Sequence, residues 1–330
     1  MGGSAMTLSL ADLQRLAGAT GFRAETLEKV LLLLDLLDAI RAHPYIGPRV
    51  ALKGGTALNL FAFGVPRLSV DIDLNYTGAV DRSTMETERP LVDRGLQAAC
   101  ERTGVTVKRI PTEHAGGKWR LSYAAAAGGT GMLELDVNFM LRTPLWPVDV
   151  RTPSALPGVP PHGAFPILDP HELAAGKLAA LLARGASRDL FDARELLRPG
   201  TLDAGRLRLA FVVYGAVNRV DWRAVGLEVV TTSAAEVTER LLPMLRSDLV
   251  PARSDVAAWT TSLVADCQQF LGVVLPLREN ERAFLDGVND RGEILPALLT
   301  NDERLRAIIA VHPALAWKAL NVRKHHGLPG

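Results

Sequence analysis

Residues 51–78, ALKGGTALNLFAFGVPRLSVDIDLNYTG, join an apolar run to a Gly-Gly-Thr turn and then to a short Asp-Ile-Asp motif. Alternation with period two places Asp71 and Asp73 on one face of a strand, with Ile72 and Leu74 on the other. Two like charges so close together are unfavourable unless a cation lies between them. The stretch therefore predicts a strand that presents a pair of carboxylates to a cation.

The composition is that of an ordinary soluble globular protein. Of the 330 residues, 48% are hydrophobic and 22% charged, and the net charge of +1 gives no global field for a nucleic acid or a membrane. Cys100 and Cys267 form no CxxC pair, so we expect neither a disulfide framework nor a zinc site, and a reducing cytoplasm fits. No export signal or membrane span is expected. Residues 1–5 resemble an addition left by cloning, with Met6 as the native start.

The pattern of apolar residues predicts an α+β protein. Helix is expected up to about residue 41, at 55–64 and at 82–103, and strands at 49–54, 68–76, 104–110, 118–126 and 131–140. Eight prolines between residues 144 and 170 predict a connector, and helix resumes from Pro170. We therefore expect a bilobed protein, with a catalytic domain at 1–200, which includes the proline-rich connector at 144–170, and a mainly α-helical domain at 201–330.

A third and a fourth carboxylate extend the acidic motif. Glu134 and Asp136 share one face of the strand expected at 131–140, and either could join Asp71 and Asp73 if the strands are neighbours. Oxygen ligands of this kind suit Mg²⁺, with Mn²⁺ as an alternative, and three carboxylates can hold two ions that activate a hydroxyl and bind a triphosphate. Gly54 and Gly55 would let the backbone approach phosphates closely. Thr56 would add a hydroxyl at a helix N-terminus.

These motifs together resemble a known family. The chain has KGGT at 53–56, then Arg67, Ser69, Asp71 and Asp73, then Lys177 on a later helix and RDLFD at 188–192. This order is similar to that of the AbiEii/AbiGii (MenT-like) nucleotidyltransferase toxins of type IV-like toxin–antitoxin systems, within the DNA polymerase β-like superfamily. The resemblance covers residues 25–197. It implies a polymerase β-like core, in which a mixed sheet is flanked by helices.

The resemblance also implies an activity and a set of roles. The activity is metal-dependent transfer of a nucleoside monophosphate from an NTP to the 3′ end of RNA, above all tRNA, which blocks translation. Asp71, Asp73 and Asp136 would hold the metal, with Asp136 as the base and Glu134 as its rival. Gly54, Gly55, Thr56, Arg67, Ser69, Lys177 and Asp189 would bind the nucleotide, with Lys177 on its β- and γ-phosphates.

Two aspartates follow on the segment after Lys177. Asp189 and Asp192 are three residues apart, hence on one helix face, and we expect Asp192 in the site with Asp189 in support. The alternative is that Asp189 caps its helix or pairs with Arg188.

Partners and rival functions follow from the same resemblance. An antitoxin is the expected partner, and it could be a kinase that modifies Ser69 or Thr56. Basic residues at 108–109, 118, 120 and 321–327 are candidate RNA contacts, with Trp119 as a base-stacking candidate or a core residue. The alternatives are a small-molecule nucleotidyltransferase of the aminoglycoside type, which would want an acidic acceptor pocket, and a non-catalytic nucleotide-binding interaction module.

Overall fold

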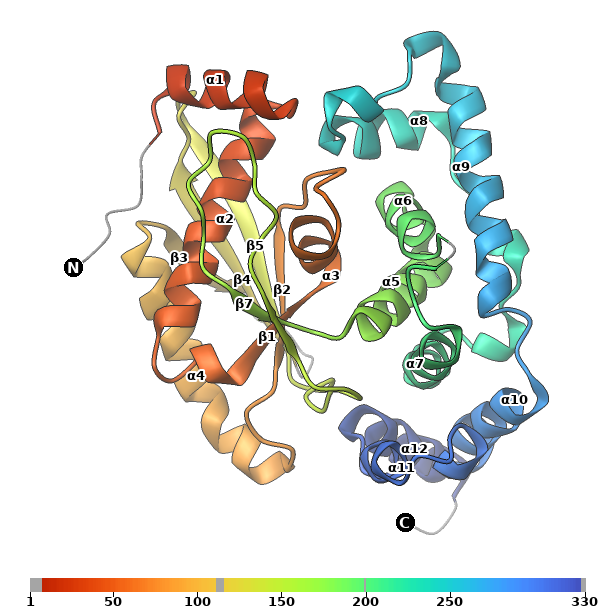
Figure 1. Ribbon diagram of the computed structural model, residues 1–330. Coiled ribbons are helices and arrows are strands. Elements are labelled where there is room, and N and C mark those ends of the chain that lie inside the picture. Colours follow the sequence, from red (N-terminus) through yellow and green to blue (C-terminus); the bar gives the residue numbers. More distant parts are fainter. Residues whose placement is uncertain (1–7, 111–115, 199, 328–330) are drawn as a thin grey trace. The chain divides into compact units, whose positions relative to one another are not determined.

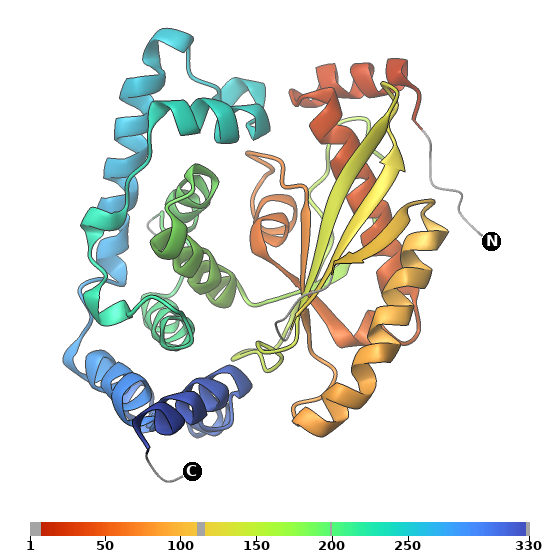
Figure 2. The same ribbon diagram turned by 180° about the vertical axis from the view of Figure 1, so that it is seen from behind.

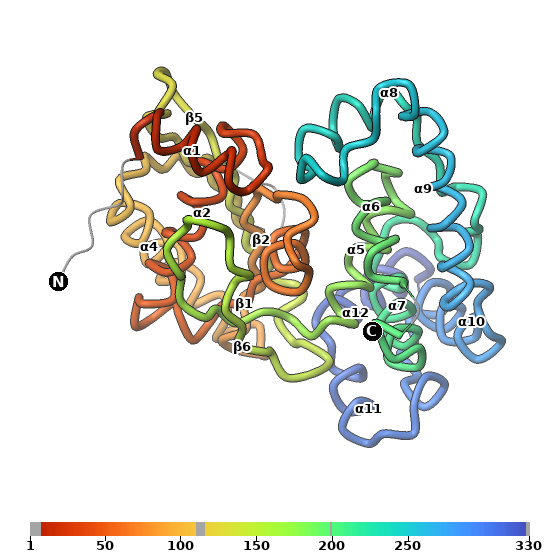
Figure 3. Tube along the Cα trace, turned by 45° about the horizontal axis from the view of Figure 1, so that its top comes forward, coloured from red at the N-terminus to blue at the C-terminus, as the bar shows by residue number. Residues whose placement is uncertain are grey.

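The computed structural model describes residues 8–110, 116–198 and 200–327, so the expectation for residues 1–5 lies outside it. The chain, traced in Figure 3, forms two compact units. The first consists of Met1–Arg142, Val148–Leu168 and Leu242–Val250, and the second of Thr143–Pro147, Asp169–Leu241 and Pro251–Gly330.

The first unit is built on a mixed sheet of seven strands within the described residues. Its order is β3-β4-β5-β2-β1-β7-β6, with β2 parallel to β5, β1 parallel to β7, and the other neighbours antiparallel. The strands are β1 (Val50–Lys53), β2 (Asp71–Tyr76), β3 (Thr106–Ile110), β4 (Gly117–Ala124), β5 (Thr130–Asn138), β6 (Asp149–Arg151) and β7 (Phe165–Ile167).

Helices cover both faces of this sheet. The helices of the unit are α1 (Leu10–Thr20), α2 (Ala24–Ala42), the short α3 (Gly54–Thr56) and α4 (Arg82–Arg102). Figures 1 and 2 show α2 and α4 along one face and α3 beside β2 on the other. The α+β class and the mixed sheet with flanking helices are thus confirmed.

The helix expected after the glycine pair is irregular. Gly54–Thr56 form a single α-helical turn, and Ala57–Ala62 continue as a π-helical stretch that ends at Phe63. Its side chains are almost all buried, because the segment packs against the sheet. An insertion of this kind shifts the hydrogen-bonding partner of each residue by one, and such π segments occur often at functional sites.

Two segments of the first unit depart from the expected domain plan. The proline-rich connector supplies β6 and β7 at one end of the sheet, and Leu52 pairs with Ile167. Residues 242–250 lie beyond position 200, yet they belong to this unit. The amide of Leu68 donates to the carbonyl of Met244 over 2.8 Å, and the amide of Arg246 donates to the carbonyl of Pro66 over 3.0 Å.

The second unit is helical. Its helices are α5 (Pro170–Arg184), α6 (Ser187–Leu196), α7 (Ala204–Ala216), the short α8 (Ala234–Glu236), α9 (Val256–Phe270), α10 (Glu279–Asp286), α11 (Glu303–Ala310) and α12 (Pro313–His326). Helix α5 packs against α6 and α7, and α6 packs against α9. A boundary at residue 200 would therefore fall inside this unit, between helices that share one core.

None of the helices within the described ranges is both long and apolar enough to cross a membrane.

Candidate active site

Four acidic side chains lie on one face of the sheet of the first unit. In the parallel pair β2–β5, Asp71 is opposite Glu134 and Asp73 is opposite Asp136. All four are partly exposed, whereas Ile72, Leu74, Leu135 and Val137 between them are buried. The alternation predicted from the sequence is therefore present in both strands. The pairing brings the second acidic pair beside the first.

The glycine turn closes one side of this acidic face. Gly54 has φ of +73°, a left-handed conformation that favours glycine, and a Cβ there would lie 2.3 Å from Oδ2 of Asp73. Gly55 is in similar contact, since its Cβ would lie 2.8 Å from Oγ of Ser69 and 3.0 Å from Nη2 of Arg67. The two glycines thus let the backbone run directly against the side chains expected at the nucleotide site.

Three further residues expected to bind nucleotide are buried around this turn. Thr56 is 1% exposed, and its hydroxyl donates to the backbone carbonyl of Asp71 over 2.5 Å. Arg67 is 2% exposed and donates from Nη1 to the carbonyl of Leu68, and Ser69 is 6% exposed. The proton of Thr56 is therefore used to tie the turn to β2. A kinase could reach either hydroxyl only if this region opened.

Lys118 contacts the two carboxylates of β5 unequally. It lies opposite Asp136 in the β4–β5 pair, and its Nζ is 2.7 Å from Oε2 of Glu134 and 3.9 Å from Oδ2 of Asp136. The hydrogen bond to Glu134 raises the pKa of Lys118, so the amine stays charged. The carboxylate of Glu134 is thus already paired with Lys118. Asp136 is the less engaged of the two and lies beside Asp73, which favours it as the third carboxylate.

The environment of Asp136 favours the protonated form of its carboxyl group. Partial burial raises the pKa of this carboxyl above its usual range, and the charges of Asp73 and Glu134 add to the effect while Lys118 opposes it. A carboxylate with a raised pKa is a better proton acceptor than an ordinary one, which suits a general base.

The donor set of this face fits a divalent ion that is shared with a substrate. No three His, Cys, Asp or Glu side chains converge as a ready-made metal cage in the part of the chain that the structure describes. Mg²⁺, however, is commonly held by one or two carboxylates together with phosphate oxygens and water. Asp71 and Asp73 supply two such carboxylates, and the bare Cα of Gly54 leaves room for the Asp73 carboxylate.

Lys177, Asp189 and Asp192 form a separate cluster in the second unit. Nζ of Lys177 lies 2.7 Å from Oδ1 of Asp189 and 2.9 Å from Oδ2 of Asp192, and the three side chains are 8%, 3% and 0% exposed. Arg184 adds a contact of 2.6 Å to Asp189. Burial acts to raise the pKa of Asp189, but the positive charge of Lys177 and the hydrogen bond from Arg184 outweigh it and lower the pKa.

This cluster joins two helices, because Lys177 is on α5 and both aspartates are on α6. The pairing of Asp189 with its neighbour Arg188, considered from the sequence, is replaced by pairing with Lys177 and Arg184. The expected grouping of Lys177 with the RDLFD segment is thus present. Whether Lys177 binds phosphate stays a prediction.

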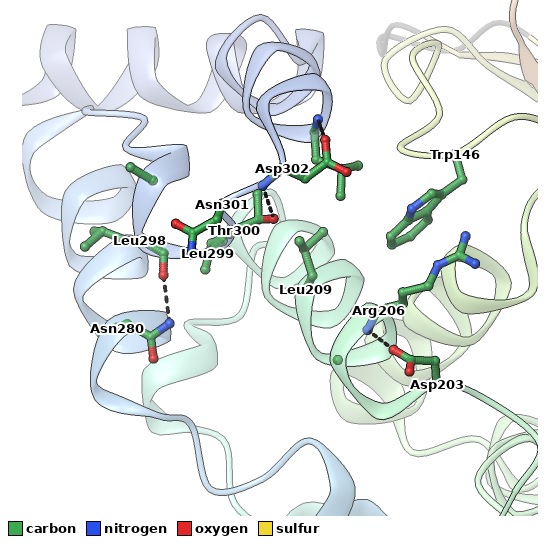
Figure 4. Close-up of a pocket in the computed structure, with 13 residues that line it drawn as sticks. Trp146, Asp203, Arg206, Leu209, Asn280, Leu298, Leu299, Thr300, Asn301 and Asp302 are labelled. Carbon is green, nitrogen blue, oxygen red and sulfur yellow. Dashed lines mark hydrogen bonds between the residues drawn. The ribbon is translucent and has the colours of Figure 1, made fainter.

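A cavity of about 540 Å³ lies elsewhere in the second unit (Figure 4). Trp146, Asp203, Arg206, Asn280 and residues 297–302 are among its lining. None of the residues predicted from the sequence to bind nucleotide or metal lines it. Its polar side chains are mostly engaged with the protein, since Asn280 donates to Leu298 and Asp203 and Asp302 cap helices.

Comparison with known families identifies the chain. A family profile described as nucleotidyl transferase AbiEii toxin, type IV toxin–antitoxin system, matches residues 35–267. The protein belongs to the AbiEii nucleotidyltransferase toxin family. The matched residues include both strands of the acidic face, the glycine turn and the Lys177 cluster.

A solved structure has the same fold. MenT4, a nucleotidyltransferase toxin from Mycobacterium tuberculosis H37Rv, superposes with a TM-score of 0.57 at 20% sequence identity, covering 93% of this chain and 98% of that one. The comparison with curated proteins finds no match. The AbiEii assignment thus accounts for the combination of a mixed sheet and a helical unit.

Sequence reasoning missed two contributors to this face. It offers Lys118 only as an RNA contact, although the place of this residue opposite Asp136 puts it beside the acidic pair of β5. The second contributor is residues 244–246, which hold the segment that carries Arg67 by backbone hydrogen bonds, with a β-bridge between Arg67 and Leu245. The sequence of these residues does not predict the contact, because it depends on where the chain returns to the sheet and not on side-chain type. The alternation of strand 117–124 could have revealed the first.

Proposed function

We propose that this AbiEii-family protein transfers a nucleoside monophosphate from an NTP to the 3′-hydroxyl of an RNA, above all tRNA, and thereby blocks translation. The observation that supports this most is the alignment of Asp71, Asp73 and Asp136 on adjacent strands, against a glycine turn that follows β1. Carboxylates beside a backbone that can approach phosphates are what nucleotidyl transfer needs.

Each residue of the face has a role in this proposal. Asp71 and Asp73 would hold the metal, and the glycine backbone approaches the oxygens of the triphosphate. Asp136 accepts the proton of the attacking 3′-hydroxyl, and Lys118 keeps Glu134 engaged. Arg67 and Ser69, in contact with Gly55, keep the turn in shape. The bond between the α-phosphorus and the oxygen that bridges it to the β-phosphate breaks, and a bond forms between the RNA 3′-oxygen and the α-phosphorus. Pyrophosphate is the leaving group.

A divalent ion, Mg²⁺ or Mn²⁺, would supply charge neutralisation of the triphosphate and lower the pKa of the attacking hydroxyl. Lys177 is proposed to act on the β- and γ-phosphates, and Asp189 and Asp192 to fix its position. The proposed location is the cytoplasm, where NTPs and tRNA are present.

A cognate antitoxin is the proposed regulatory partner. If it is a kinase, Ser69 is the preferred target over Thr56, because the Thr56 hydroxyl already donates to the Asp71 carbonyl. A phosphate on Ser69 would bring about −1.5 to −2 charges beside Gly55 and repel an incoming triphosphate. Mass spectrometry of the co-expressed protein tests this. Neutralisation with both hydroxyls unmodified would assign another mode to the antitoxin.

The function is tested with each of the four α-labelled NTPs, Mg²⁺ and total tRNA. We expect label on RNA with the wild type, loss of label on chelation of the metal, and recovery with Mg²⁺ or Mn²⁺. Asp73→Asn should remove the transfer while the protein stays folded, because Asp73 is half-buried and its charge is the feature lost.

The matched control is Asp149→Asn in strand β6 of the same sheet, where the carboxylate pairs with Arg151 and is largely exposed. This variant should transfer as the wild type does. Transfer by Asp73→Asn at the wild-type rate, or label on a small acceptor such as an aminoglycoside but not on RNA, would contradict the proposal.

A further inference from the structure

The C-terminal end of the described chain is basic, whereas the rest of the protein is not. Residues 304–327 contain five of the 37 Lys and Arg residues and none of the 36 Asp and Glu residues. The remainder of the chain therefore carries 32 basic against 36 acidic side chains. Three of the five basic residues lie on α12, which also holds two histidines at its end.

Helix α12, labelled in Figure 1, is fixed to its own unit by one face. Ala314, Leu315 and Ala319 are buried, and a Cβ at Gly292 would lie 2.5 Å from the carbonyl oxygen of Ala319, so the backbones are in close contact. At its flanks, Lys318 donates to the carbonyl of Asn218 over 3.2 Å and Arg323 to that of Gly292 over 2.7 Å. The helix is thus held firmly, and its other face is presented.

The presented face combines an aromatic ring with a cation. Trp317 is 56% exposed, and Leu320, Asn321 and Lys324 are exposed at spacings of three, four and seven residues from it. These positions fall on one side of a helix. The Lys324 amine makes no hydrogen bond or ion pair within the residues that the structure describes. Trp317 is therefore not part of the core, and together with the exposed Leu320 it forms an apolar surface that suits binding.

We propose that this face of α12 docks RNA, with an unpaired base stacked on Trp317 and a neighbouring phosphate paired with Lys324. Bases stack on exposed aromatic side chains without sequence preference, and lysines contact the backbone. Residues 304–327 carry five basic and no acidic side chains, a charge that favours a polyanion as the ligand of this face. This inference rests on the proposed function only in naming RNA as the acceptor.

The test measures the affinity of the full-length protein for fluorescently labelled total tRNA by anisotropy at several salt concentrations. Trp317→Ala should weaken binding by about 5- to 150-fold, because stacking of one base contributes that much. Trp317→Phe should keep most of the affinity, since the ring is retained. Lys324→Gln should reduce the slope of log affinity against log salt by about 0.7.

Arg102→Gln is the matched control, because Arg102 also lies exposed in the last turn of a helix, α4, and its loss removes one positive charge. It should leave tRNA affinity unchanged, and none of these variants should alter the KM for NTP.

The outcomes separate this inference from the proposed function. Wild-type affinity for tRNA in Trp317→Ala would overturn the docking site, even if transfer to RNA is observed. Weaker tRNA binding by Trp317→Ala, with no nucleotide transfer by the wild type, would support docking and contradict the function. Unchanged tRNA affinity with lost neutralisation by the co-expressed antitoxin would assign this face to a protein partner and overturn the RNA proposal.

Discussion

A methyl group on Gly54 should displace the carboxylate of Asp73. In Gly54→Ala the added Cβ would lie 2.3 Å from Oδ2, whereas ordinary contacts begin at 3.4 Å, so the carboxylate or the turn must move by about 1 Å. A misplacement of that size in a catalytic group lowers the rate by roughly 100-fold. We therefore expect transfer of label to RNA to fall by about two orders of magnitude.

The same substitution also strains the backbone. Alanine in the left-handed region is less favourable than glycine by about 1–2 kcal/mol, which lowers the melting temperature by about 2–4 °C per kcal/mol in a unit of this size. Loss of activity must therefore be separated from loss of fold. The assay follows label transfer at a temperature at which circular dichroism shows the variant to be fully folded.

Gly104→Ala is the matched control. Gly104 has φ of +74°, nearly the same as Gly54, but no atom beyond its chain neighbours lies within 4 Å of the position that a Cβ would take. Both variants should lose stability through the left-handed backbone strain, and only Gly54→Ala should lose transfer. Equal transfer by both would refute the argument that the turn and Asp73 form one site.

Three further predictions concern Lys177, Glu172 and Ser69. Lys177→Met should lower the free energy of unfolding by about 3–5 kcal/mol in urea, because two buried aspartates lose their common cation, whereas Arg184→Met, largely exposed, should lose far less. Burial raises the pKa of Glu172 to about 7, so the contribution of this carboxyl to stability is full below about pH 4.5 and is lost as the pH rises through 7. Relative to Glu172→Gln, the free energy of unfolding of the wild type should fall by on the order of 3 kcal/mol across that window. The same pH dependence of this free energy in both proteins, measured by urea unfolding, would contradict this. Ser69→Asp should abolish nucleotide transfer, and wild-type kinetics would exclude the contact with Gly55 as part of the site.

The acidic face could be predicted from local pattern, since the alternation around Asp71 and Asp73 defines a strand with a polar side. Its pairing with Asp136 could only be suggested, because a helix and two strands lie between β2 and β5 in the chain. The register of the two strands is set by burial of the apolar side chains between the carboxylates. The contact of Gly54 with Asp73 likewise depends on how distant segments meet.

Other features lie beyond local pattern for physical reasons. The strand β7 could not be predicted because it contains Pro166, and proline cannot donate a backbone hydrogen bond to a neighbouring strand. The short β7, next to the terminal strand β6, nevertheless accommodates this proline. The return of residues 242–250 to the first unit depends on backbone hydrogen bonds that no residue type announces. The ion cluster of Lys177 links two helices, so the sequence identifies its partners only as nearby segments.

Chemical removal of the RNA 3′-hydroxyl tests most directly whether this group is the acceptor of the nucleotide. Total tRNA is divided, and one half is oxidised with periodate, which destroys the terminal 3′-hydroxyl and leaves the rest of the RNA intact. Both are incubated with the protein, Mg²⁺ and α-labelled NTPs. We expect label on intact tRNA and none on the oxidised half. Equal label on both, or none on either with any NTP, would contradict it.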